Sequence, residues 1–135
     1  TGEWHAISGT LEALECLRRA DWRIVVTANQ AGIARKLFDL ETRARRHETM
    51  HRQVRDAGGM IDADSYCPHG PDDHCYCRKP APGMLHDIGR RLHTDLTNVP
   101  AIGDSLRDIQ AAQAAGASPV LVKTGKGSIT TGLPV

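Results

Sequence analysis

The amino-acid sequence predicts an α/β fold built around a parallel β-sheet. Two apolar patterns alternate along the chain: short runs rich in β-branched residues, typical of buried strands, and longer stretches with helical spacing. The run Trp22–Ala28 (WRIVVTA) is the clearest strand, and Leu40–Ala57 is the clearest helix. Strands that alternate with helices favour a parallel sheet with right-handed crossovers.

The first four predicted elements are two helices and two strands. Apolar residues recur at helical spacing after Ser8, a possible N-cap, and Cys16 lies on this helix, where we expect a small buried residue. The β-branched run that follows indicates a strand buried on both faces. Gly58 ends the second helix. In chain order, we predict a helix over 11–20, a strand over 22–28, a helix over 40–57 and a strand over 61–66.

The second half of the chain continues this alternation. Pro82 suits the first turn of a helix, and Gly116 closes a later one. We predict a helix over 82–92, a strand over 99–102, a helix over 105–115 and a strand over 119–122. Because no repeat, linker or low-complexity segment interrupts these elements, we predict that residues 1–135 form a single domain.

The composition argues against several classes of function. A net charge of +1 without a basic block argues against nucleic acid as the main partner. No apolar run approaches the length of a transmembrane helix, and no secretory signal is present. A content of 40% hydrophobic and 24% charged residues is typical of a globular protein. We expect a cytoplasmic monomer without a nucleic-acid or membrane partner.

The most distinctive segment is a loop that carries three of the four cysteines. Cys67 and His69 form a C-x-H pair, and a C-x-C pair at Cys75 and Cys77 follows. Three thiolates and one imidazole are the ligand set of a closed, structural zinc site, and a metal ion would order a loop too polar to build a core. A disulfide or free thiols are the alternatives, although cysteines two positions apart pair poorly. We interpret His74 as a solvent-exposed loop residue.

Two polar segments follow predicted strands, and ligands of an open α/β sheet bind beyond the carboxyl ends of its strands. Thr27, Asn29 and Gln30 offer hydroxyl, amide and backbone N–H groups that suit an anion, or simply a turn stabilised by Asn. Asp104 and Asp108 lie one helical turn apart, which suits Mg²⁺. The alternative for this pair is helix capping by Asp104, with Asp108 favoured by the helix dipole.

The cysteine loop ends in two cations, Arg78 and Lys79. Alone, such a pair is expected on a solvated surface. Together with a pair of magnesium-binding carboxylates and an anion-binding turn, it predicts a pocket for phosphoryl transfer, because each component stabilises negative charge on a transferring phosphoryl group.

A further motif has a different interpretation. Residues 47–51 (HETMH) match H-E-x-x-H, the zinc signature of metalloproteases. In those enzymes the motif lies on a largely buried helix, whereas arginines flank it on both sides here. We therefore interpret His47 and His51 as partly buried residues on a helix face, and we expect no zinc there.

Four segments, taken in order, carry a family resemblance: Val26–Arg35 (VTANQAGIAR), the cysteine loop with CRKPAPGM, GDSLRDIQAA and LVKTGKG. They resemble the bacterial D-glycero-D-manno-heptose-1,7-bisphosphate 7-phosphatases of the haloacid dehalogenase superfamily. The cysteine loop joined to CRKP is the most specific segment, and it is shared mainly with the related histidinol-phosphate phosphatases. The resemblance implies a three-layer parallel sheet and a Mg²⁺-dependent phosphatase acting in synthesis of the lipopolysaccharide inner core.

The resemblance also implies roles for individual residues. Lys79 would stabilise a phosphoaspartyl intermediate, Arg78 would contact the substrate, and Asp104 would help to hold Mg²⁺. The implied zinc ligands are Cys67, His69, Cys75 and Cys77, and the implied substrate-contacting turn contains Asn29 and Gln30.

The sequence departs from the family pattern in two places. The family begins with a central strand that ends in D-x-D-G-T, which supplies the nucleophile and the general acid/base, and residues 1–135 contain no such motif. The D-x-D at Asp62 and Asp64 comes too late in the chain, and we interpret it as a coincidence. Ala28 and Ala31 replace a Thr and a Ser of the family.

These departures lead to further expectations. We expect the central strand and its nucleophile to precede Thr1, so that residues 1–135 alone are N-terminally incomplete and do not turn over a phosphate ester. Two alternatives to the heptose phosphatase are a histidinol-phosphate phosphatase and a non-catalytic zinc-binding domain.

Overall fold

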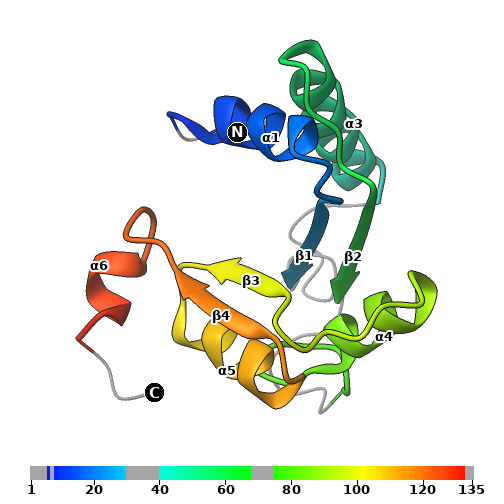
Figure 1. The fold of residues 1–135 in the computed structure, drawn as a ribbon. Helices are drawn as coiled ribbons and strands as arrows, with labels where there is room; N and C mark the ends of the chain where they lie inside the picture. Colours follow the sequence, from blue (N-terminus) through cyan, green and yellow to red (C-terminus); the bar gives the residue numbers. More distant parts are fainter. Residues whose placement is uncertain (1–5, 7, 30–39, 68–74, 133–135) are drawn as a thin grey trace. The chain divides into compact units, whose positions relative to one another are not determined.

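The computed structural model describes residues 6, 8–29, 40–67 and 75–132 (Figure 1). The chain divides into two compact units, Thr1–Pro68 and His69–Val135, and each is described by itself. The single domain predicted over residues 1–135 stays a prediction.

The described residues of the first unit form two parallel strands and two helices, which are labelled in Figure 1. Its elements are α1 (Thr10–Arg19), β1 (Val25–Asn29), α3 (Leu40–Asp56) and β2 (Ala63–Cys67). The register of β1 and β2 runs from Val25 opposite Ala63 to Asn29 opposite Cys67. Because the strands are parallel and end as partners, the turn after β1 and the cysteine loop after β2 begin at the same edge of this sheet.

The end of α3 is fixed by its glycines, as the sequence predicts. Gly58 has a φ of 92°, in the left-handed region, and its N–H donates to the carbonyl of Arg55. The N–H of Gly59 donates to the carbonyl of Val54, which completes a Schellman motif. Val54 is itself among the most buried side chains of the unit, so the helix ends where its apolar face meets the core.

Three local expectations for this unit are wrong. The N-cap of α1 is Gly9, without a side-chain hydrogen bond, rather than Ser8. Cys16 is exposed, because it lies on the outward face of α1. The first strand begins at Val25 and is half-buried; Trp22 lies in the turn after α1, where its N–H donates to Leu17 and its side chain is 52% exposed.

The second unit places a helix against another pair of parallel strands. Its elements are α4 (Gly83–Arg91), β3 (Pro100–Gly103), α5 (Leu106–Ala114), β4 (Ser118–Leu121) and α6 (Gly127–Thr130). β3 and β4 pair from Pro100 opposite Ser118 to Gly103 opposite Leu121, and α5 packs on both strands (Figure 1). The sequence did not predict α6, because four residues are too few to show a period.

Apolar side chains on α4 and α5 form the core of this unit. The buried residues are Met84, Ile88, Ile109, Ala111 and Ala112. The predicted α/β architecture with parallel strands is therefore confirmed, with element ends shifted by a few residues. Within the part of the chain that the structure describes, no helix is long and apolar enough to cross a membrane.

Candidate active site

The candidate active site is built around a carboxylate at the start of α5. Asp108 Oδ1 lies 2.6 Å from Nζ of Lys79, and the two side chains are only 18% and 17% exposed. Asp108 Oδ2 accepts hydrogen bonds from the Ser105 hydroxyl at 2.9 Å and from the Ser105 and Asp104 amides at 3.2 Å each. One carboxylate thus binds an ammonium group and closes the first turn of a helix.

The same contacts form a capping box. Ser105 is the N-cap of α5, its hydroxyl accepts from the Asp108 amide, and Asp108 returns a bond to the Ser105 amide. From the sequence, the alternative to metal binding at this site was that Asp104 caps α5. The helix is capped, but the N-cap residue is Ser105 and not Asp104. The reason is the chain's path: β3 ends at Gly103 and leaves Ser105 with the extended backbone that an N-cap requires.

The electrostatic surroundings keep Asp108 ionised. Burial alone would raise the pKa of this carboxyl, but the hydrogen bond and charge of Lys79, helped by the hydroxyl and amide of Ser105, outweigh burial and lower the pKa below its ordinary value. Since protein donors surround its two oxygens, the geometry favours Asp108 as the partner of Lys79 over Asp108 as a metal ligand.

Asp104 differs from Asp108 in having an oxygen available. Its Oδ2 accepts from the amide of Lys126 at 2.7 Å, and no residue described in the structure donates to its Oδ1. Asp104 immediately follows β3, at the carboxyl end where ligands of α/β sheets bind. An anionic oxygen in this position suits a hard cation such as Mg²⁺.

The loop after β4 orients Asp104. A Cβ added at Gly125, which has a φ of 58°, would lie 2.2 Å from Asp104 Oδ2, so only glycine permits this approach. The hydroxyl of Thr130, on α6, donates to the backbone carbonyl of Asp104 at 2.8 Å. Sequence reasoning missed Gly125, Lys126 and Thr130 as supports of the site; the only signal was the segment LVKTGKG, which entered through the resemblance alone.

Two cysteines of the loop come together in the second unit. Of the three predicted cysteine ligands, Cys67 ends β2 and is buried, and Cys77 is buried as well. The sulfurs of Cys75 and Cys77 are 3.7 Å apart, far beyond the roughly 2 Å of a disulfide. Two thiolates bound to one tetrahedral zinc at about 2.3 Å would lie about 3.8 Å apart, so this pair fits the metal. The fourth predicted ligand, His69, lies outside the described residues.

The predicted substrate turn is described only in part. Thr27 is half-buried on β1 opposite Ser65, and Asn29 ends that strand, while Gln30 lies outside the described residues. Arg78 is half-buried and directly follows the last cysteine. The roles assigned to these residues therefore stay predictions.

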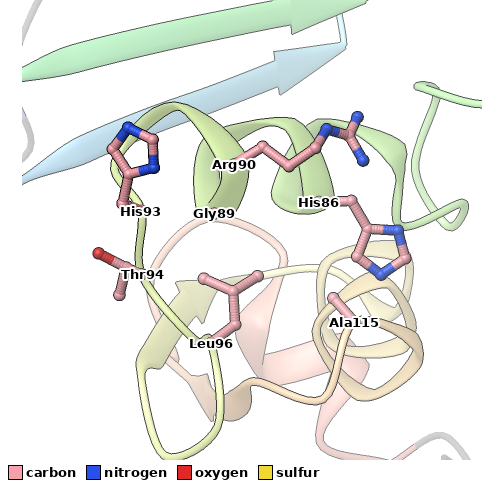
Figure 2. A pocket seen from close by; sticks show the side chains of 7 residues that line it. All are labelled: His86, Gly89, Arg90, His93, Thr94, Leu96 and Ala115. Carbon is pink, nitrogen blue, oxygen red and sulfur yellow. The ribbon is translucent and has the colours of Figure 1, made fainter.

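A surface pocket lies away from this chemistry. Its walls come from α4, the segment after it and the end of α5, as Figure 2 shows, and none of the predicted site residues lines it. Ala115, on its wall, follows the last residue of α5, whereas Asp108 lies in the first turn of that helix. The lining residues are His86, Gly89, Arg90, His93, Thr94, Leu96 and Ala115.

Comparison with protein families places the second unit among known hydrolases. The family model described as HAD-hydrolase-like matches residues 76–133. This stretch contains Lys79, Asp104 and Asp108, together with the loop that carries Gly125.

Curated relatives match almost the whole chain. A D-glycero-beta-D-manno-heptose-1,7-bisphosphate 7-phosphatase from Bordetella bronchiseptica is 54% identical over 135 residues, which cover 98% of this chain and 75% of the relative. The protein of the same name from Pseudomonas aeruginosa is 46% identical over 133 residues, again with 98% of this chain and 75% of the relative covered.

Solved structures give the same picture for the fold. A crystal structure of D,D-heptose 1,7-bisphosphate phosphatase from B. bronchiseptica, complexed with magnesium and phosphate, matches with a TM-score of 0.94 at 54% identity, covering 97% of this chain and 75% of that chain. The corresponding enzyme from Burkholderia thailandensis matches with a TM-score of 0.77 at 41% identity, covering 99% of this chain and 78% of that chain.

The lowered pKa of Asp108 leads to a prediction about stability. A carboxyl whose pKa is depressed on folding adds stability above its unfolded pKa of about 4, and this stability is lost as the pH falls through the folded pKa. We expect Asp108→Asn to lower the free energy of unfolding by about 2–3 kcal/mol at pH 7 and by much less at pH 3. Urea unfolding at pH 7, 5 and 3 measures the difference.

A matched control is Asp56→Asn, at the exposed end of α3, where we expect a change below about 0.5 kcal/mol. An equal loss of stability in Asp108→Asn at pH 7 and pH 3 would contradict the role of the ionised carboxylate.

Proposed function

The chain belongs to the family of D-glycero-beta-D-manno-heptose-1,7-bisphosphate 7-phosphatases among the HAD-like hydrolases, and we propose that the protein removes the 7-phosphate from such a heptose bisphosphate. The observation that carries the substrate class is the 54% identity over 98% of the chain with a relative of that name. The arrangement of Lys79, Asp108 and Asp104 supports the chemistry.

Asp104 is the residue that we propose as a ligand of Mg²⁺. Its Oδ1 accepts no hydrogen bond from the described residues, whereas Oδ2 is fixed by the Lys126 amide. Carboxylate oxygen is a ligand that Mg²⁺ prefers, and the related crystal structure is a complex with magnesium and phosphate. Bound there, the cation would offset the negative charge of the phosphoryl group.

Lys79 supplies a second positive charge. Its ammonium group is held by Asp108, so it does not have to be ordered when a substrate binds. We propose that this cation stabilises negative charge on the phosphoryl group during transfer. Arg78, its neighbour, is proposed to contact the substrate, as are Thr27, Asn29 and Gln30 in the turn after β1.

The proposed reaction is an in-line attack of a carboxylate on phosphorus, followed by hydrolysis of the aspartyl phosphate by water. The attacking carboxylate and the general acid/base are not assigned to any residue of 1–135, because these residues lack the D-x-D-G-T motif. Asp104 and Asp108 are not substitutes, since the first is the proposed metal ligand and the second is bonded to Lys79.

We propose a structural zinc ion at Cys67, Cys75 and Cys77, with His69 as the fourth ligand. Thiolate sulfur and imidazole nitrogen suit zinc, and four protein ligands would close its coordination to substrate. The zinc would order the loop that leads directly into Arg78, and so support the reaction without taking part in it.

Two other functions compete with this one. The names of the relatives favour the heptose substrate over histidinol phosphate. A non-catalytic zinc-binding domain is favoured by one observation, the loss of two hydroxyl groups at Ala28 and Ala31. A phosphate-release assay of the full protein with heptose 1,7-bisphosphate and with histidinol phosphate separates all three, because the binding domain would release phosphate from neither.

The cellular setting is part of the proposal. The proposed zinc site requires reduced cysteines, the state that is expected in the cytoplasm, so we propose that compartment. The product of the proposed reaction would serve carbohydrate metabolism, in the synthesis of lipopolysaccharide core precursors. We propose a monomer that acts on a small phosphorylated sugar.

Removing either charge of the site is expected to lower turnover. Asp104→Asn removes an anionic metal ligand, and Lys79→Ala removes the cation that faces the phosphoryl group, so each variant of the full protein should release phosphate on the order of a hundredfold more slowly. The controls Asp56→Asn and Arg91→Ala alter exposed charges and should keep wild-type rates. Near-wild-type turnover in both site variants would place the active site elsewhere.

Loss of the thiolates is expected to remove one equivalent of tightly bound zinc. The double variant Cys75→Ser, Cys77→Ser leaves too few ligands for a closed site, which metal analysis after dialysis would detect. Cys16→Ser, at an exposed cysteine on α1, is the matched control and should retain the zinc. If the double variant kept its full zinc content, the proposed ligand set would be wrong.

Crowding Asp104 is expected to weaken the binding of magnesium. Gly125→Ala introduces a methyl group where only 2.2 Å separates it from Asp104 Oδ2, so the carboxylate must move. We expect the Mg²⁺ concentration for half-maximal phosphate release to rise by about tenfold to a hundredfold. Gly132→Ala, whose added methyl would meet nothing nearer than 3.7 Å, should leave this concentration unchanged.

A further inference from the structure

Three possible metal ligands, none of them a cysteine, converge in the first unit. His47 and His51 lie one turn apart on α3, and Asp64 lies on β2. Each residue offers one ligand atom, and these three atoms all lie within 4.8 Å of one another. Nε2 of His47 contacts Asp64 Oδ2, and Nε2 of His51 lies 3.3 Å from the same oxygen.

The arrangement follows from the two elements that carry it. Residues four apart on a helix share a face, so both imidazoles point the same way, and their rings stack with centroids 4.4 Å apart. Asp64 meets them from the strand, and the three side chains are only 25–29% exposed. A carboxylate withdrawn from solvent in this way requires positively charged or donor partners.

The third residue changes the interpretation of the H-E-x-x-H segment. From the sequence, the two histidines lacked a further ligand, and Asp64 belonged to a D-x-D that had no function. The predicted partial burial of the histidines on a helix face is confirmed. The contact of both histidines with Asp64 could not be predicted from the sequence, because it joins residues of a helix to a residue of a strand.

The donor set suits a borderline transition metal, and so does the spacing of one of its ligand pairs. Two imidazole nitrogens and one carboxylate oxygen are ligands of Zn²⁺, Co²⁺ or Ni²⁺, whereas Mg²⁺ prefers oxygen alone. Ligands about 2.0–2.1 Å from a tetrahedral zinc lie about 3.3–3.4 Å apart, which is the distance between His51 Nε2 and Asp64 Oδ2.

We propose that His47, His51 and Asp64 form a second transition-metal site, for an ion of the Zn²⁺ class. With three protein ligands the site is open, so water completes the coordination. Each histidine would present its Nε2 to the ion. The ion would fasten α3 to β2, and its binding would stabilise the folded protein.

A cobalt titration of the full protein tests this proposal. The protein is first loaded with zinc and dialysed against a weak chelator, so that only thiolate-bound zinc remains. Co²⁺ is then added while visible absorption is followed. Cobalt bound by nitrogen and oxygen gives d–d bands without the intense charge-transfer absorption of thiolate ligands, which distinguishes this site from the cysteine cluster. The thermal midpoint with and without Co²⁺ gives a second measurement.

We expect one further equivalent of Co²⁺ to bind the wild-type protein and to raise its thermal midpoint. His51→Gln and Asp64→Asn should each lower the affinity by at least about tenfold to a hundredfold and remove the shift in midpoint. His86→Gln, at an exposed histidine of α4, should behave like wild type. Circular dichroism without metal confirms that each variant is folded.

Two results would overturn the proposal. One is a wild-type protein that binds no further equivalent, which would leave a metal-free hydrogen-bonded group of two histidines and an aspartate. The other is unchanged binding in folded His51→Gln and Asp64→Asn. Either result leaves the proposed phosphatase untouched, because neither depends on phosphate release.

Discussion

The contact between Lys79 and Asp108 links the folding of the second unit to its proposed chemistry. The aspartate closes the first turn of α5 and, through its other oxygen, holds the ammonium group 2.6 Å away. A single carboxylate that accepts from several donors stays charged at low exposure, and each donor strengthens the others. The helix start, the position of Lys79 and the backbone of Asp104 therefore depend on one another.

The donor atoms distinguish the three cation sites that we propose along the chain. Asp104 offers oxygen, which suits a hard ion, and the cysteine loop offers sulfur, which suits a soft one. The group on α3 and β2, around His47, mixes nitrogen with oxygen. Because the donor sets differ, we expect the oxygen site to select a different ion from the two sites that contain sulfur or nitrogen.

The sequence predicted what depends on local pattern. The alternation of strands and helices, the glycine end of α3 and the cysteine cluster all follow from residues close together in the chain. The role of Asp108 could not be predicted in this way, because a carboxylate one helical turn after Asp104 suits either a metal ion or the start of a helix. The choice is made by Lys79, which lies 29 positions away in the chain. The role of Thr130 could not be predicted either, since its helix has four residues, too few to show a helical period.

The bonds from α6 to Asp104 have a consequence for how the site comes into being during synthesis. β3, β4 and α5 are all translated before Thr130, whose hydroxyl binds the backbone of Asp104. A nascent chain that has not reached α6 has the strands and α5 of the second unit but lacks the bonds that orient Asp104, the carboxylate that we propose as a metal ligand. We therefore expect the chain to become able to bind the ion only late in synthesis, after β3 and β4 have paired.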